Sequence, residues 1–107
     1  MASAVFNCVK ENERSLVDEK ALLISLSLGI PIDDFYEVDG RLTYRGPASG
    51  YVADCEEYLS LVNKYDEEAI LEASLYMFNL IRRGVRGKLG GRASELLSEL
   101  GLLRANP

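Results

Sequence analysis

Histidine is absent from all 107 residues of the chain, and tryptophan is absent as well. Without imidazole there is no Ser-His-Asp or Cys-His catalytic arrangement, and no zinc site that needs a histidine ligand. The side chain used most often for acid–base catalysis near neutral pH is also missing. Neighbouring acidic residues along the chain are better explained as solvated helix faces than as metal ligands. We therefore expect a protein that is not an enzyme and that carries no metal or cofactor.

Cysteine is scarce, because only Cys8 and Cys55 are present. Two thiols are too few for a four-thiolate metal site, and no Cys-X-X-Cys pair indicates redox exchange. The sequence alone does not decide whether the two residues form a disulfide. We expect two reduced thiols, because no secretory signal is visible and Cys55 lies on the apolar stripe of a predicted helix.

Long apolar runs are missing too. No run reaches the length of about eighteen residues that suggests a membrane span. The longest candidate, residues 21–32, is interrupted by two serines, a glycine and a proline. We expect no membrane association and a cytoplasmic location.

The overall composition is that of an ordinary globular protein. Hydrophobic residues make up 48% of the chain and charged residues 27%, which argues against intrinsic disorder. The length fits one compact domain over residues 1–107. The first fourteen residues have weak periodicity, and we expect them to form a loose arm or a short strand.

A helix is predicted between Ser15 and Gly29, although the sequence pattern there is ambiguous. Ser15 is a plausible N-cap, and the following acidic residues suit the first turn of a helix. Gly29 and Pro31 are typical of a helix end. Leucine and isoleucine also alternate over residues 22–30, as they would in a strand. The end signals favour the helix.

Residues 34–45 are predicted to form a β-hairpin. Asp39-Gly40 lies between two β-prone segments, and this dipeptide favours a two-residue turn in which both residues have positive φ. That turn pairs Val38 with Arg41 and Phe35 with Tyr44. It places Phe35, Glu37, Leu42 and Tyr44 on one face, and Tyr36, Val38 and Thr43 on the other.

Three further helices are predicted at about 49–64, 67–83 and 92–100. The helix at 67–83 has Asp66 as its N-cap and Gly84 as its stop, and it is the most apolar of the three. We expect it to lie at the centre of the fold. Gly101 should end the last helix, so that Leu102 and Leu103 fold back onto it. The fold class is then α+β, mainly α, with about four helices and one hairpin.

The charge is unevenly distributed along the chain. Residues 1–81 contain 6 basic and 15 acidic residues, a sum of −9, whereas residues 82–107 contain 6 basic and 2 acidic residues, a sum of +4. Glycines and cations alternate in residues 82–92, a pattern that suits phosphate or nucleic acid. The acidic remainder of the chain opposes binding of a polyanion. The candidate anion-binding residues are Arg82, Arg83, Arg86, Lys88 and Arg92.

Tyrosine is the main aromatic residue, with 6 copies against 3 phenylalanines. Tyr51, Tyr58 and Tyr65 recur every seven positions, which places them along one line of a helix. Tyrosine is enriched at protein interfaces, because it combines a large apolar area with a polar tip. We interpret these three residues and Tyr36 as a candidate partner-binding surface. The alternative is that the rings cover the margin of the core.

These observations favour a small protein-interaction module over an enzyme. Such a module would be a regulator, adaptor, assembly factor or inhibitor. Its acidic, tyrosine-lined surface predicts a protein partner with a basic surface, and self-association is a second option. The alternative function is nucleic-acid or phosphate binding by the basic segment at residues 82–92.

Overall fold

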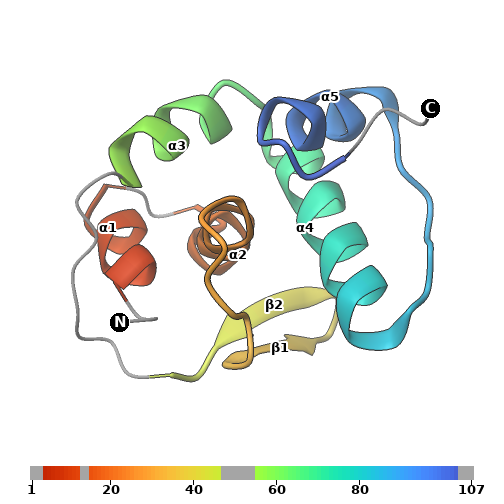
Figure 1. The fold of residues 1–107 in the computed structure, drawn as a ribbon, viewed down its shortest axis with the longest axis horizontal. Coiled ribbons are helices and arrows are strands. Elements are labelled where there is room, and N and C mark those ends of the chain that lie inside the picture. Colours follow the sequence, from red (N-terminus) through yellow and green to blue (C-terminus); the bar gives the residue numbers. More distant parts are fainter. Residues whose placement is uncertain (1–3, 13–14, 47–54, 104–107) are drawn as a thin grey trace.

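The computed structural model describes residues 4–12, 15–46 and 55–103. Within these ranges it contains five helices and a two-stranded hairpin packed on them (Figure 1). The mainly α, α+β class is therefore confirmed, with one helix more than expected. The elements are α1 (Ala4–Asn12), α2 (Val17–Ser27), β1 (Phe35–Val38), β2 (Arg41–Tyr44), α3 (Cys55–Val62), α4 (Glu67–Arg83) and α5 (Gly91–Glu99).

Helix α2 lies at the centre of the fold, a place that we predicted for α4. It lies among α1, α3, α4 and β2 and contacts each of them (Figure 1). Every residue from Glu19 to Ser25 is buried. Burial on all sides explains the ambiguous sequence pattern, because a helix without a solvent face has no need of a helical stripe. Helix α4 flanks α2 and α5 and keeps an exposed side.

The prediction of a loose arm or strand at the N-terminus was wrong, because α1 is a helix. Val5 and Val9 are four positions apart and fully buried, and Cys8 lies between them on the same side. This short apolar stripe packs against α2 and α3. A nine-residue helix is marginal in isolation, so these tertiary contacts determine its structure.

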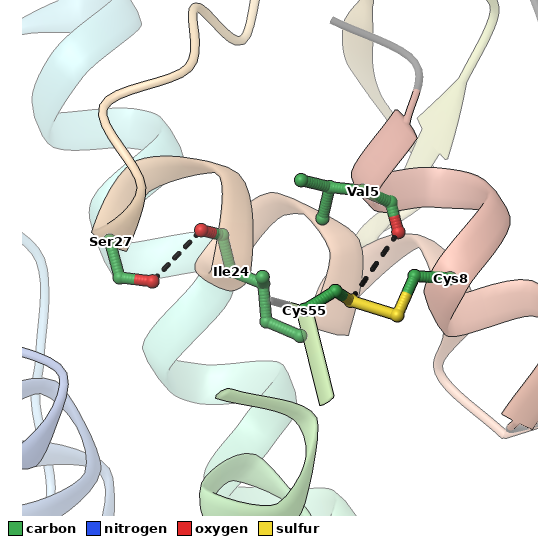
Figure 2. The surroundings of a disulfide bond; sticks show 5 residues. All are labelled: Val5, Cys8, Ile24, Ser27 and Cys55. Atoms are coloured by element: carbon green, nitrogen blue, oxygen red, sulfur yellow. Dashed lines mark hydrogen bonds between the residues drawn. A yellow bond between two sulfur atoms is a disulfide. The ribbon is translucent and has the colours of Figure 1, made fainter. Parts of the chain in front are cut away.

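The expectation of two reduced thiols was also wrong, because Cys8 and Cys55 form a disulfide (Figure 2). Once α1 is helical, Cys8 faces the first residue of α3, and the two Cα atoms lie 6.2 Å apart. The Cys55 sulfur lies 3.9 Å from the carbonyl oxygen of Val5 and is fully buried. The bridge ties the start of α3 to α1 across 47 positions of sequence. A disulfide that closes a long loop typically stabilises a protein by about 2–4 kcal/mol.

The N-cap predicted for α4 is confirmed, whereas the N-cap predicted for α2 is wrong. Asp66 is the N-cap of α4, and its carboxylate accepts a hydrogen bond from the Ala69 N–H at 2.9 Å. Ser15 does not cap α2. Leu16 holds the N-cap position with φ 53°, and the Ser15 hydroxyl donates instead to Glu67, at the start of α4.

Helices α4 and α5 end as the glycines predict. Gly84 and Gly101 both have positive φ, at 67° and 77°. After Gly101 the chain folds back, so that the Leu102 N–H donates to the Leu97 carbonyl at 2.8 Å. Leu102 and Leu103 pack against the core. None of the helices in the described ranges has the length and hydropathy that a membrane span needs.

The hairpin has the predicted turn and register. Phe35 pairs with Tyr44 and Val38 with Arg41, and Asp39 and Gly40 have φ values of 53° and 76°. Phe35 and Leu42 are each only 3% exposed and form the inner face against the helices. Because an isolated hairpin is marginal in water, this packing is what keeps it folded.

The turn can be tested with Gly40→Val and a matched control, Gly87→Val. A Cβ at either glycine would meet no atom within 4 Å, but only Gly40 has positive φ. We expect Gly40→Val to lower the free energy of unfolding by about 1–3 kcal/mol, because a β-branched residue is strained at positive φ. Gly87→Val should change it little. Urea melts of the three proteins decide the point, and equal losses in both variants would contradict the turn assignment.

Candidate functional site

The outer edge of β2 is closed by two carboxylates of α2. In this register the N–H groups of Leu42 and Tyr44 point away from β1. Glu19 accepts from the Leu42 N–H at 2.8 Å, and Asp18 accepts from the Tyr44 N–H at 3.2 Å. Helix α2 therefore satisfies the donors that an edge strand would otherwise leave open.

Glu19 also forms an ion pair with Arg41, the first residue of β2. The Arg41 guanidinium donates to its two carboxylate oxygens at 2.8 and 3.1 Å. The Glu19 side chain is fully buried, whereas that of Arg41 is 52% exposed. The hydrogen bond to Glu19 raises the pKa of Arg41. Because two donors on consecutive residues share one carboxylate, the pair fixes the position of β2 against α2.

Asp18 differs from its neighbour in its electrostatics. Burial raises the pKa of Asp18 above its ordinary value of 3.8, and the hydrogen bond from Tyr44 opposes that rise. The folded state therefore holds the proton of Asp18 more tightly than the unfolded chain does. Its charge costs stability at neutral pH, whereas that of Glu19 is matched by Arg41.

The other strand, β1, is held next to the end of α4 by two ion pairs. Arg83 donates to Glu37 at 3.0 Å and to the Asn79 side chain at 2.7 Å. Arg82 lies 3.6 Å from Asp33, just before β1. These contacts join residues that are about 46 to 49 positions apart and bring the hairpin and the last turn of α4 to one corner of the molecule (Figure 1).

The exposed large hydrophobic side chains of the described residues lie on the elements that meet there. Tyr36 and Val38 on the outer face of β1 are 43% and 40% exposed, and Ile81 and Val85 at the end of α4 are 48% and 53% exposed. We call these four residues the hairpin–α4 corner. Single exposed hydrophobic residues are common, but here all four of the described residues lie on two segments that neighbour each other in the fold.

The predicted tyrosine surface is dispersed by the fold. Tyr51 lies outside the described residues, Tyr58 is half-buried against the core, and Tyr65 is only 6% exposed. Burial raises the pKa of Tyr65, and the Arg92 guanidinium lies 4.3 Å from the centre of its ring. Tyr36 remains exposed, and the guanidinium carbon of Arg45 lies 5.5 Å from the centre of its ring.

The predicted basic segment divides into paired and unpaired cations. Arg82 and Arg83 bind acidic residues at the start of the hairpin, and Arg92 binds Glu95 at 2.5 Å. Arg86 and Lys88 are exposed and make no ion pair within the described part of the chain. The segment runs along the outside of α4 to α5, where the Gly90 N–H donates to Glu72 at 2.5 Å (Figure 1).

Metal-ligating clusters and surface depressions are the other features that could hold a ligand. No group of three or more cysteine, aspartate or glutamate side chains is placed to hold an ion there. A shallow depression open to solvent runs along α3 and is lined by Glu56, Leu59, Ser60, Asn63 and Lys64. The hairpin–α4 corner is the place in these ranges where large hydrophobic side chains are exposed.

Comparison of the chain with protein-family models, with curated proteins and with solved structures finds no match. The basis for a functional proposal is therefore the geometry of the described residues.

Two isosteric substitutions on neighbouring residues test how the hairpin is held. We expect Glu19→Gln to lower the free energy of unfolding by about 1.5–3 kcal/mol, because it removes a charged acceptor shared by Arg41 and Leu42. Asp18→Asn keeps an acceptor for Tyr44 and removes a charge that is costly to bury. It should therefore cost less than Glu19→Gln at pH 7.

The pH dependence of folding stability tests the direction of the pKa shift of Asp18. Because the pKa of Asp18 is raised on folding, its contribution to stability is largest below 3.8 and is lost as the pH rises through the folded value. Wild type should therefore lose stability relative to Asp18→Asn between pH 4 and pH 7. Urea melts at both pH values measure this, and a change of opposite sign would contradict the burial of this carboxylate.

Proposed function

We propose that this chain is a non-enzymatic protein-interaction module that binds its partner through the hairpin–α4 corner. The observation that carries the proposal is the exposure of Tyr36 and Val38 on β1, of Ile81 on α4 and of Val85 just after α4, in segments held together by ion pairs. A regulator, adaptor, assembly factor or inhibitor needs such a surface and no catalytic group.

The chemistry of the corner resembles that of protein interfaces. Such interfaces combine an apolar centre with a polar rim and are enriched in tyrosine and arginine. Here the apolar side chains are flanked by Arg45, Arg82 and Arg83, whose guanidinium groups already contact aromatic rings or carboxylates. A partner can therefore cover the apolar area without leaving these cations unpaired.

A partner with a basic surface is still expected at the opposite end of α4. Glu67 and Glu68 in the first turn of α4 are exposed and form this acidic end. This acidic end and the hairpin–α4 corner lie at the two ends of one helix, so one partner can contact either end or both.

Nucleic-acid or phosphate binding by residues 82–92 is the weaker alternative. Three of its five cations are already paired with carboxylates, which leaves Arg86 and Lys88 for an anion. A net charge of −5 opposes the approach of a polyanion at physiological salt.

We also propose a cytoplasmic location, and this location has a consequence for the disulfide. Cytosolic thiols are held reduced, so the Cys8–Cys55 bridge would be open there. The binding function would then have to persist in reducing conditions, which is reasonable because the bridge joins α1 to α3 and the corner lies on the hairpin and α4.

The partner can be identified by affinity purification of the tagged chain from its own host cells, followed by quantitative mass spectrometry. Ile81→Lys places a charge in the corner, and Ser98→Lys makes the same kind of change on an exposed position of α5. We expect a protein partner that is recovered with wild type and Ser98→Lys but is depleted about tenfold or more with Ile81→Lys.

Equal recovery with both variants would contradict the corner as the binding surface. Recovery of DNA or RNA, with salt-sensitive binding that is lost when Arg86 and Lys88 are replaced by glutamine, would overturn the proposal in favour of the alternative.

A further inference from the structure

The two edges of the hairpin are not equivalent. The Arg45 N–H donates to the Asp34 carbonyl at 2.9 Å, and the pairing continues in phase through Tyr36–Thr43 and Val38–Arg41. Phe35 and Glu37 therefore direct their backbone groups away from β2. The Phe35 N–H donates to the Ile32 carbonyl at 3.1 Å, but the Glu37 N–H has no acceptor within the described residues.

The open edge of β1 carries few of the devices that usually protect a strand. It contains no proline and no lysine, and the exposed Tyr36 and Val38 flank the free backbone groups of Glu37. Glu37 points to the inner face, where an unpaired charge would discourage pairing, but Arg83 binds it at 3.0 Å. The charge that would protect this edge is thus balanced within the chain.

We propose that β1 is a self-association edge, on which a second copy of this chain pairs antiparallel about a two-fold axis at Glu37. This inference rests on the proposed function and names a second copy as a partner of the hairpin–α4 corner. The Glu37 N–H of each copy donates to the Glu37 carbonyl of the other, which joins the two hairpins into a four-stranded sheet. Such a contact is isologous, so it closes at two copies.

The register of the proposed pairing between the two β1 strands follows from the backbone N–H groups that β1 has available. Pairing Glu37 with Glu37 uses the donor that has no acceptor in the described residues and leaves the Phe35–Ile32 hydrogen bond intact. It also places Tyr36 opposite Val38 of the second copy, twice, on the outer face. Aromatic and β-branched residues are favourable cross-strand neighbours. A shift that brings Phe35 opposite Glu37 would need the Phe35 N–H, which already donates to Ile32.

The self-complementary pattern is what selects a second copy over an unrelated strand. Tyr36 and Val38 lie on either side of Glu37. The two-fold rotation therefore brings Tyr36 of each copy opposite Val38 of the other. On the inner face the two Glu37 carboxylates approach each other, and each brings its own Arg83. The four charges sum to zero. Because the strand is only four residues long, the dimer is weak and depends on concentration.

The test is sedimentation equilibrium of the purified full chain between about 10 µM and about 1 mM, a range that covers weak association. Val38→Lys places a charge at the proposed contact. Thr43→Lys places the same charge on the same face of the hairpin, but on β2. We expect wild type and Thr43→Lys to dimerise as concentration rises, and Val38→Lys to stay monomeric. Thermal melts of each variant check that the fold is retained.

A second readout reports the backbone contact itself. In NMR spectra of wild type, amide shifts at residues 35–38 should move with concentration, and the Glu37 N–H should become protected from exchange. A wild type that is monomeric throughout, or a dimer that Val38→Lys and Thr43→Lys weaken equally, would overturn the inference. Either result leaves the proposed function standing if Ile81→Lys still abolishes recovery of a different protein, so the two failures are distinguishable.

Discussion

The buried carboxylate of Glu19 is the interaction on which the arrangement of this fold depends. It is fully buried in the central helix, and it accepts three hydrogen bonds from β2, two from the Arg41 guanidinium and one from the Leu42 N–H. A buried charge is costly unless it is paired and fully hydrogen-bonded, so this carboxylate tolerates few other positions of the hairpin. The apolar side chains of Phe35 and Leu42 supply the burial energy, and Glu19 specifies where they go.

The proposed functional surface follows from this constraint. When α2 closes the β2 edge, β1 is left as the outer strand, and its alternation turns Tyr36 and Val38 to solvent. The ion pairs of Arg82 and Arg83 then bring the end of α4, with Ile81 and Val85, beside it. The same two cations balance acidic residues at Asp33 and Glu37, so part of the basic segment is paired within the acidic protein.

Local signals in the sequence were sufficient for much of the fold. The Asp39-Gly40 turn determines the hairpin register from within four residues, and Asp66 and Gly84 determine both ends of α4. Such predictions succeed because the groups involved are neighbours in the chain. The helix at α2 was predicted from its end signals, although Ser15 turned out to bind Glu67 instead of capping it.

The features that were missed depend on distant parts of the chain. Cys8 meets Cys55 only because α1 is helical, and α1 is helical because Val5 and Val9 find α2 and α3. Tyr65 fits the sequence pattern of a surface tyrosine, but α5 covers it with Arg92. The Glu19–Arg41 pair spans 22 positions and has no motif that announces it. Of the tyrosines predicted to form a binding surface, Tyr36 alone among the described ones is well exposed. The sequence gives no reason to single out Val38, Ile81 and Val85, which are exposed because of where the fold places the hairpin and the end of α4.

Amide hydrogen exchange at the two edges of the hairpin tests the central role of the α2 carboxylates most directly. In dilute protein, we predict that the Leu42 and Tyr44 amides are strongly protected, although they point away from the partner strand, because Glu19 and Asp18 accept from them. The Glu37 amide, on the open edge, should exchange quickly under the same conditions. Exchange of the Leu42 and Tyr44 amides at the same rate as that of Glu37 would contradict the closed edge and the placement of the hairpin that depends on it.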